Sequence, residues 1–201
     1  MSTSEIQALE RQIFELNSKL IELRKSNSAR EEVADYPFET LQGTVSLSQL
    51  FETKDKLLVI HNMGQGCRYC TLWGDGFNGF IPHLESVMSL VMVSKDTPSA
   101  QRRFASSRGW NFKMASHSGG QYIQEQSVME GESNMPGVVL YEKVDGKIFR
   151  QSSAIFGPGD LYCSMWSLLG LAGMSASDWT PQFSYWKSPG TLDDGGENLP
   201  D

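Results

Sequence analysis

Residues 57–73 read LLVIHNMGQGCRYCTLW, and this stretch decides the fold. The four apolar residues at its start, followed by a glycine-containing loop, predict a buried strand. Cys67 and Cys70 stand at the far end of the loop, where a helix can begin. The stretch therefore predicts two thiols at the N-terminus of a helix that follows a buried strand.

The chemistry of thiols gives the two cysteines different roles. The thiolate is the reactive form, and the partial positive charge at a helix N-terminus lowers a thiol pKa from about 8.5. Cys67 is nearer to the helix end and is the candidate nucleophile, whereas Cys70, about one turn later, is the candidate resolving thiol. Arg68, between them, adds a permanent positive charge that also favours a thiolate.

Two other interpretations of the pair stay open. A CxxC motif can be half of a zinc site, but a structural zinc site needs four ligands, usually from a second paired motif. The other candidate ligands occur singly along the chain: Cys163, His61, His83 and His117. We therefore predict no metal. The cysteines could also be incidental core residues, which the strand, loop and helix context disfavours.

The composition predicts one domain with appendages. A chain of 201 residues can bury a core without disulfides, and three cysteines, an odd number, argue against a secreted disulfide scaffold. We expect a cytoplasmic protein, because the chain shows no signal-peptide pattern and no stretch that approaches 18 apolar residues. The net charge of −7 argues against binding to nucleic acid or to anionic membranes. We see no phosphate-binding glycine pattern and expect no cofactor.

Residues 1–35 are expected to form an amphipathic helix and a polar linker. Apolar residues recur at alternating spacings of three and four, which is a heptad seam. They are Ile6, Leu9, Ile13, Leu16, Leu20 and Leu23. The seam predicts either a helix through which the chain forms a homodimer or a helix docked on its own domain. Fewer than three heptads are marginal as an isolated coiled coil, so both stay open.

Residues 36–173 alternate strand and helix signals, which predicts an α/β layer structure with parallel strands. A buried strand is expected at residues 86–94, and a helix starts at Pro98 with Thr97 as its N-cap. Glycines and a proline should interrupt the helix after the dithiol. Asp145 and Gly146 predict a hairpin turn, and a last helix is expected at residues 161–171 with Asp160 as its cap.

Cys163 and a group of basic residues have simple structural interpretations. Cys163 lies on the apolar last helix and should be a buried thiol. Four basic residues are expected to form a solvated charged face: Arg102, Arg103, Arg108 and Lys113.

Residues 174–201 change in composition to an aromatic and then an acidic tail. The aromatic side chains are expected to pack on a surface such as that of a partner subunit; they are Trp179, Phe183, Tyr185 and Trp186. Residues 188–201 are rich in Gly, Pro and acidic residues, and we expect them to be disordered.

The order of these elements resembles the thioredoxin superfamily over residues 36–172. The matching features are a strand, a CxxC motif at a helix start, a strand, a helix, and then Met135-Pro136 before an antiparallel hairpin and a last helix. The resemblance implies a thioredoxin-like three-layer fold, with a mixed central sheet flanked by helices and an N-terminal helical extension. It also implies a cis peptide bond at Pro136, facing the dithiol.

Finer details resemble an uncharacterised bacterial family of thioredoxin-like proteins that are often labelled dithiol-disulfide isomerases. The matching segments are residues 59–79, residues 103–110 and Pro136-Gly137-Val138. This resemblance implies the fold strongly and the activity much less, because the label is itself inferred from the fold.

Three departures from the superfamily bear on the chemistry. Gly66 replaces the usual tryptophan before the first cysteine, and Arg68-Tyr69 replaces Gly-Pro, so the redox potential does not carry over. His61 occupies the place of a buried acid and is a candidate base for the resolving thiol, or else a core histidine. Gly64 stands where peroxiredoxins need threonine, which lowers the expectation of peroxidase activity.

The leading hypothesis is a thiol-disulfide oxidoreductase acting on a protein or small-molecule disulfide. Its predicted catalytic residues are Cys67, Cys70 and His61. Its predicted substrate-binding residues are Gly66, Arg68, Tyr69, Met135 and Pro136. Two alternatives stay open: a peroxiredoxin-like peroxidase, and a non-catalytic dimeric module that binds partners or senses redox state.

Overall fold

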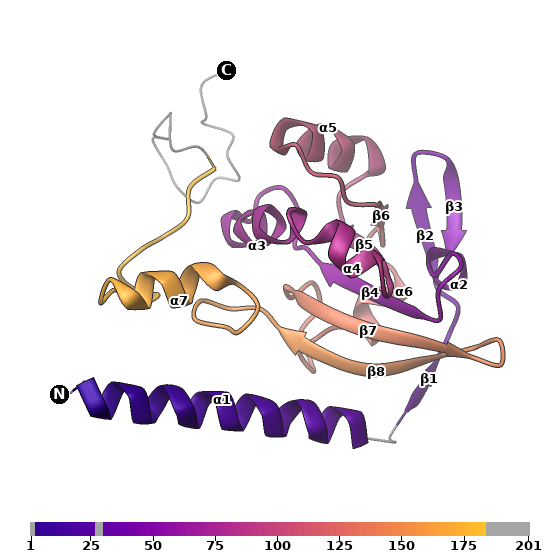
Figure 1. Cartoon of the computed structure of the whole chain (residues 1–201). Helices are drawn as coiled ribbons and strands as arrows, with labels where there is room; N and C mark the ends of the chain where they lie inside the picture. Colours follow the sequence, from indigo (N-terminus) through magenta and orange to yellow (C-terminus); the bar gives the residue numbers. More distant parts are fainter. Residues whose placement is uncertain (1–2, 27–29, 184–201) are drawn as a thin grey trace. The chain divides into compact units, whose positions relative to one another are not determined.

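A mixed β-sheet forms the centre of the larger part of the chain (Figure 1). The computed structural model describes residues 3–26 and 30–183, and within them the sheet has eight strands. The strands are β1 (Glu31–Val33), β2 (Pro37–Thr40), β3 (Gly43–Ser46), β4 (Lys56–His61), β5 (Ser89–Ser94), β6 (Met114–Ser116), β7 (Gly137–Val144) and β8 (Lys147–Ile155). The helices are α1 (Thr3–Ser26), α2 (Leu47–Leu50), α3 (Arg68–Asn78), α4 (Ile81–Glu85), α5 (Pro98–Arg108), α6 (Gln121–Glu125) and α7 (Ser164–Leu171).

The strands are ordered β1-β8-β7-β4-β5-β6-β2-β3 across the sheet. The central strands β4, β5 and β6 are parallel, and β7 pairs with β4 in the antiparallel direction. All six residues of β5 are buried, as expected for a strand that is covered on both faces. In the register of β4 and β7, His61 lies opposite Gly137. This pairing brings the loop before β7 to the end of β4 where the dithiol loop begins.

Helices cover both faces of the sheet, which gives the expected three-layer, mixed α/β fold. On one face, α2 and α6 contribute Leu47, Tyr122 and Ile123 to a core with Val59 and Tyr141. On the other face, α3, α4, α5 and α7 form a second, more aromatic core. Its helical members include Trp73, Ile81, Ala105 and Trp166. The dithiol helix α3 belongs to this second layer.

Several local predictions are confirmed. Helix α5 starts at Pro98 with Thr97 as its N-cap, and its C-cap, Gly109, has a φ of 69°. The β7–β8 hairpin turns at Asp145 and Gly146, which both have positive φ. The helix after the dithiol is interrupted between α3 and α4, as its glycines and proline predicted.

Two boundaries differ from the prediction for identifiable reasons. The last helix starts at Ser164 rather than at residue 161. The Asp160 carboxylate accepts hydrogen bonds from the N–H groups of Gly157, Tyr162 and Cys163, so it holds a turn that precedes the helix. The expected linker contains β1, which lies at the sheet edge beside β8.

The aromatic segment packs on its own domain as far as the structure describes it. The rings of Trp179 and Trp166 are 6.1 Å apart, edge to face, and Phe183 is buried. The chain itself therefore covers Phe183 and part of Trp179. Tyr185, Trp186 and residues 188–201, for which packing and disorder were predicted, lie outside the described residues.

The N-terminal residues form a separate unit. The chain divides into two compact units, residues 1–31 and residues 32–201. Helix α1 is the helix of the first unit and contains all six seam residues. In the part of the chain that the structure describes, no helix is both long enough and apolar enough to cross a membrane.

Candidate functional site

The dithiol loop connects β4 to α3 and is held by local hydrogen bonds. The Asn62 side-chain oxygen accepts the N–H of Gly64 at 2.8 Å, and the Asp96 carboxylate accepts the N–H of Gln65 at 2.8 Å. Gly64 has a φ of 116°, and a Cβ there would lie 3.0 Å from an Asp96 oxygen. The loop therefore needs glycine at this position for both its backbone angle and its packing.

Cys67 and Cys70 are bonded to each other in a disulfide, with their Cα atoms 5.2 Å apart. Cys67 is the N-cap of α3, and its Sγ accepts the backbone N–H of Cys70 at 3.0 Å. Cys67 is partly exposed, whereas Cys70 is only 3% exposed, and its Sγ lies 3.5 Å from the N–H of Met63. The geometry provides an accessible sulfur at a helix N-terminus and a protected sulfur behind it.

Two of the predicted substrate-binding residues, Arg68 and Tyr69, make contacts within the protein. Arg68 is 8% exposed, and its guanidinium donates to the carbonyl oxygen of Pro181 at 3.1 Å. Tyr69 packs in the aromatic core, with its ring centroid 6.3 Å from those of Trp73 and Trp166. The third, Gly66, is exposed in the dithiol loop. Of the three, Gly66 is thus the most open to solvent.

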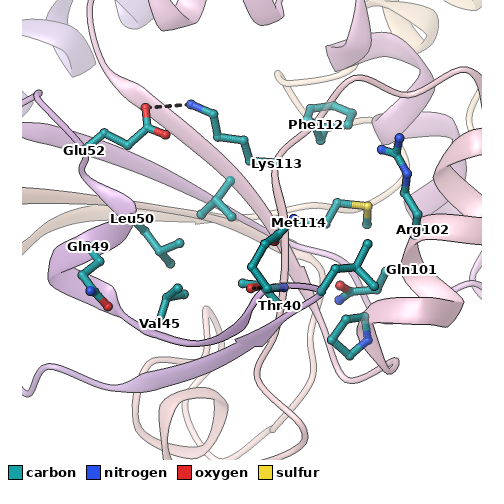
Figure 2. Close-up of a pocket in the computed structure, with 14 residues that line it drawn as sticks. Thr40, Val45, Gln49, Leu50, Glu52, Gln101, Arg102, Phe112, Lys113 and Met114 are labelled. Carbon is teal, nitrogen blue, oxygen red and sulfur yellow. Dashed lines mark hydrogen bonds and ion pairs between the residues drawn. The ribbon is translucent and has the colours of Figure 1, made fainter.

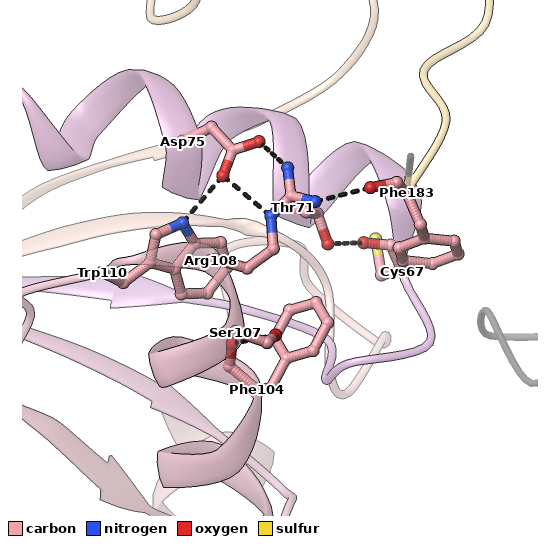
Figure 3. A network of polar contacts seen from close by, with 8 residues as sticks. All are labelled: Cys67, Thr71, Asp75, Phe104, Ser107, Arg108, Trp110 and Phe183. Carbon is pink, nitrogen blue, oxygen red and sulfur yellow. Dashed lines mark hydrogen bonds and ion pairs between the residues drawn. The ribbon is translucent and has the colours of Figure 1, made fainter. Parts of the chain in front are cut away.

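A second arginine holds the same C-terminal segment, residues 181–183. Arg108 donates to the Phe183 carbonyl oxygen at 2.6 Å, and its guanidinium also pairs with the Asp75 carboxylate through two nitrogens (Figure 3). Asp75 lies on α3 and accepts the indole N–H of Trp110 at 2.8 Å. Arg68 of α3 and Arg108 of α5 thus both hold residues 181–183 by hydrogen bonds to their carbonyl oxygens.

Arg108 was expected to lie on a solvated charged face, and this expectation is wrong. Its guanidinium joins α5, α3 and the C-terminal segment. No local sequence pattern links Asp75, Arg108 and Phe183, because they lie far apart in the chain and belong to three different elements.

The loop before β7 lies beside the dithiol loop. The Asn134 side-chain nitrogen is 3.5 Å from the carbonyl oxygen of Met63, the residue whose N–H faces the Cys70 sulfur. Met135 is partly buried and Pro136 is buried. The predicted cis bond at Pro136 is wrong, since none of the described peptide bonds is cis. The trans isomer is the intrinsically preferred one, and here Asn134 turns the chain with a φ of 61°.

His61, the candidate base, lies at the end of β4 in the core that α6 covers. The side chain is 3% exposed, and Nε2 is 2.8 Å from the hydroxyl of Tyr122. Burial, followed by the charges of His117 and Arg150, lowers the pKa of His61 from 6.5 to about 3. A thiol of ordinary pKa, about 8.5, gives up its proton to such an imidazole only with difficulty. The geometry therefore favours a core histidine.

Tyr122 continues a buried polar network away from His61. Its hydroxyl is 3.3 Å from that of Tyr141, which donates to the Gln126 side-chain oxygen at 3.1 Å. Burial raises the pKa of the Tyr122 hydroxyl well above 10.0, so it stays protonated. Through this network, the hydroxyl groups of Tyr122 and Tyr141 have hydrogen-bond partners in an otherwise apolar core.

The remaining thiol, Cys163, is buried as predicted, at the N-cap of α7. The pKa of its thiol is raised, mainly because the side chain is buried. Among the described residues, no group of three or more His, Cys, Asp and Glu side chains is placed to hold a metal ion.

A cavity of about 420 Å³ lies apart from the dithiol loop, between the β2–β3 hairpin and α5 (Figure 2). Apolar side chains such as Val45, Leu50 and Met114 line it. At its edge, Lys113 donates to the Glu52 carboxylate at 2.8 Å, and Arg102 lies across from this ion pair. Its lining residues include none of the predicted site residues.

The profile of one protein family matches residues 3–187 of this chain, which is most of its length. The chain belongs to the DUF899 family. The description of that family reads "Bacterial protein of unknown function". A comparison of this DUF899 chain with curated protein sequences finds no match.

Solved structures similar to this DUF899 chain include peroxiredoxins. The bacterioferritin comigratory protein of Xanthomonas campestris has a TM-score of 0.56 and 15% identity, over 74% of this chain and 100% of that one. Enterococcus faecalis AhpC has a TM-score of 0.52 and 14% identity, over 73% and 93% of the two chains. Reduced Prx3 from Vibrio vulnificus has a TM-score of 0.51 and 10% identity, over 74% and 99%. At these identities the likeness confirms the thioredoxin-like fold.

Proposed function

We propose that this protein is a thiol-disulfide oxidoreductase that uses Cys67 as nucleophile and Cys70 as resolving thiol. The observation that carries the proposal is the disulfide at the start of α3, with one accessible and one buried sulfur. The backbone N–H of Cys70, in the first turn of α3, donates to the Cys67 sulfur, and it would stabilise negative charge on that sulfur after reduction. This asymmetry lets a substrate reach Cys67 while Cys70 is shielded.

The proposed reaction moves two electrons from the reduced dithiol to a substrate disulfide. The Cys67 thiolate attacks one sulfur of the substrate, which forms a mixed disulfide and releases the other sulfur as a thiolate that takes up a proton. Cys70 then loses its proton and attacks the Cys67 sulfur. This second step forms the Cys67–Cys70 disulfide and releases the first substrate sulfur as a thiol. A cellular dithiol reduces the protein for the next cycle, and the reverse sequence would oxidise a dithiol.

The other predicted residues take different parts in this proposal. We assign substrate contact to Gly66, which is exposed in the dithiol loop, and to Met135, which is partly exposed in the neighbouring loop before β7. Arg68 positions residues 181–183, and Tyr69 anchors α3 in the aromatic core. His61 supports the end of β4 and does not serve as the base. A cytoplasmic location fits a disulfide that must be reduced in each cycle.

The experiment that tests the proposal is thiol trapping during equilibration with glutathione. The wild-type protein should show a two-electron Cys67–Cys70 couple between about −270 and −180 mV. The Cys70→Ser variant should accumulate a mixed disulfide on Cys67, whereas Cys67→Ser should form none and lose disulfide reductase activity. If no intramolecular disulfide forms in this range, the dithiol mechanism is wrong, and a binding or sensing module becomes the better account.

The fold likeness raises peroxide reduction as the second candidate, because the Xanthomonas protein carries alkyl peroxide reduction in its description. The site argues against it. Gly64 stands at the position where peroxiredoxins need a threonine, and its φ of 116° is a backbone conformation that a β-branched residue rarely adopts. Peroxide-dependent turnover by the Cys70→Ser variant at a rate similar to wild type would favour the peroxidase.

A further inference from the structure

The heptad seam of α1 needs a partner outside its own unit. A single helix cannot bury its own apolar stripe, and α1 is the helix that the structure describes in residues 1–31. In heptad notation, positions a and d hold the apolar seam. The a residues are Ile6, Ile13 and Leu20, and the d residues are Leu9, Leu16 and Leu23.

The charges beside this seam are divided between the two halves of the helix. The g positions are occupied by Glu5, Gln12 and Lys19. The e positions are occupied by Glu10, Asn17 and Arg24. Both flanks are therefore acidic in the N-terminal half, neutral in the middle and basic in the C-terminal half. Residues at e and g face the partner helix in a two-stranded coiled coil, and their charges set its orientation.

A parallel pair of these helices would place like charges together. In that orientation each g residue lies near the e residue five positions later on the partner helix. Glu5 would meet the partner's Glu10, and Lys19 would meet the partner's Arg24. The twofold axis repeats each contact, so all four charged contacts would be repulsive.

An antiparallel pair turns the same charges into attractive contacts. In that orientation g residues meet g residues and e residues meet e residues. Glu5 lies near the partner's Lys19, and Glu10 lies near the partner's Arg24. The neutral residues Gln12 and Asn17 each meet their own copy. All four charged contacts become favourable, while the same a and d residues form the apolar seam.

We propose that α1 binds α1 of a second copy of this chain in an antiparallel coiled coil. The apolar layers then pair Ile6 with the partner's Leu23, Leu9 with the partner's Leu20, and Ile13 with the partner's Leu16. The 24-residue helix is about 36 Å long. Because the larger unit follows the C-terminal end of α1, the two copies of that unit attach at opposite ends of the helix pair.

Disulfide trapping between two tagged full-length proteins tests the orientation. Both carry Cys67→Ser and Cys70→Ser, and one adds Ile6→Cys while the other adds Leu23→Cys. The mixture should give a cross-linked heterodimer upon oxidation, because these positions share a layer in the antiparallel pair. Ile6→Cys alone should give little cross-linked homodimer. The parent without an added cysteine is the control, since its Cys163 is buried.

Two charge swaps of identical composition separate orientation from general charge effects. Glu10→Lys with Lys19→Glu makes all four antiparallel contacts repulsive, so the heterodimer cross-link should be lost and dimerisation should weaken about tenfold or more. Glu5→Lys with Lys19→Glu keeps the antiparallel contacts attractive and should retain the cross-link. High salt should reduce the difference between the two variants.

Each outcome decides the proposal. The proposal is supported if the heterodimer cross-link forms, is lost with Glu10→Lys and Lys19→Glu, and is retained with Glu5→Lys and Lys19→Glu. An Ile6→Cys homodimer in the otherwise unmodified helix would show a parallel pair. A monomer at all concentrations, measured by sedimentation of the wild-type protein, would show that α1 docks on its own chain. Either of the last two results overturns the antiparallel dimer.

Discussion

At the scale of single residues, burial makes His61 a poor base although its position in the sequence suggests that role. The sequence placed it six residues before Cys67, which made it a candidate base. In the structure its Nε2 is bound to Tyr122, and burial keeps the imidazole neutral. Spacing along the chain identified the position, but only the fold shows which way the ring faces.

His61 should make the protein sensitive to acid. Its pKa in the folded protein is about 3, below the unfolded value of about 6.5, so the unfolded chain binds a proton first as the pH falls. The stability contribution is complete above pH 6.5 and is lost toward pH 3, with a total on the order of 5 kcal/mol. His117, whose pKa burial lowers to about 4, acts in the same direction.

Urea unfolding between pH 4 and pH 7 measures this effect. His61→Gln should reduce the slope of unfolding free energy against pH by up to about 1.4 kcal/mol per pH unit. His83→Gln, a change at an exposed histidine, is the control and should keep the wild-type slope. An unchanged slope in the His61 variant would show that folding does not lower the pKa of this imidazole.

Gly64 should tolerate no side chain without a loss of stability. Gly64→Ala forces alanine into a φ of 116° and places its Cβ against Asp96, so the variant should lose about 1–3 kcal/mol. Thermal unfolding measures the loss. Adding Asp96→Ala removes the contact but not the backbone strain, and it should restore only part of the stability. Full stability in the single variant would mean that the loop can adopt another backbone conformation.

At the scale of elements, α3 contains two glycines with opposite roles. A Cβ on Gly74 would lie 2.5 Å from the Trp110 ring, whereas a Cβ on Gly76 would meet open space. Gly74→Ala should therefore destabilise the protein by about 1–3 kcal/mol, and Gly76→Ala should stabilise it by about 0.5–1 kcal/mol. Chemical unfolding of the two matched variants provides the measurement. The reverse order of stability would contradict the packing of α3 against Trp110.

The link between α5 and the C-terminal segment also belongs to this scale. Arg108→Met keeps an apolar stem but removes the donors to Asp75 and to the Phe183 carbonyl. Gln182 and Phe183 should then exchange their amide hydrogens faster than in the wild type, and proteases should cleave the segment faster, because its ordering is partly lost. Arg102→Met, at an exposed arginine of the same helix, is the control. Equal protection in both variants would show that Arg68 alone secures the segment.

The elements also show what a sequence can predict. The dithiol at the start of α3, the cap of α5 and the β7–β8 hairpin depend on neighbouring residues, so local patterns were sufficient for them. The burial of Arg68 depends on Pro181, 113 residues later, and Arg108 depends on Phe183, 75 residues later. Such contacts leave no periodic signal in one sequence.

At the scale of the whole molecule, the two units should be separable. The core residues of the larger unit come from residues 33–183, so a chain that lacks residues 1–29 retains β1 and both cores. Its melting temperature should differ from that of the wild type by less than about 3 °C. The proposed dimer should be lost at the same time, as sedimentation would show.

A slightly longer deletion is the matched comparison. Removing residues 1–35 also removes β1 and Asp35, whose carboxylate accepts the N–H and hydroxyl of Ser48 at 2.7 Å each. This chain should melt several degrees lower than the one that lacks residues 1–29. Equal melting temperatures would show that β1 adds nothing to the sheet, and a large loss in the shorter deletion would show that α1 supports the fold.

The ties from Arg68 and Arg108 to residues 181–183 have a consequence for the newborn chain. A ribosome adds about 5–20 residues per second, so the 113 residues that separate Arg68 from Pro181 take roughly 6–23 s to synthesise. During that interval β4, α3 and their thiols can already be outside the ribosome, while the segment that will cover Arg68 does not yet exist. Until residues 181–183 emerge, reductants of the cell can reach the dithiol at a surface that the finished protein no longer presents.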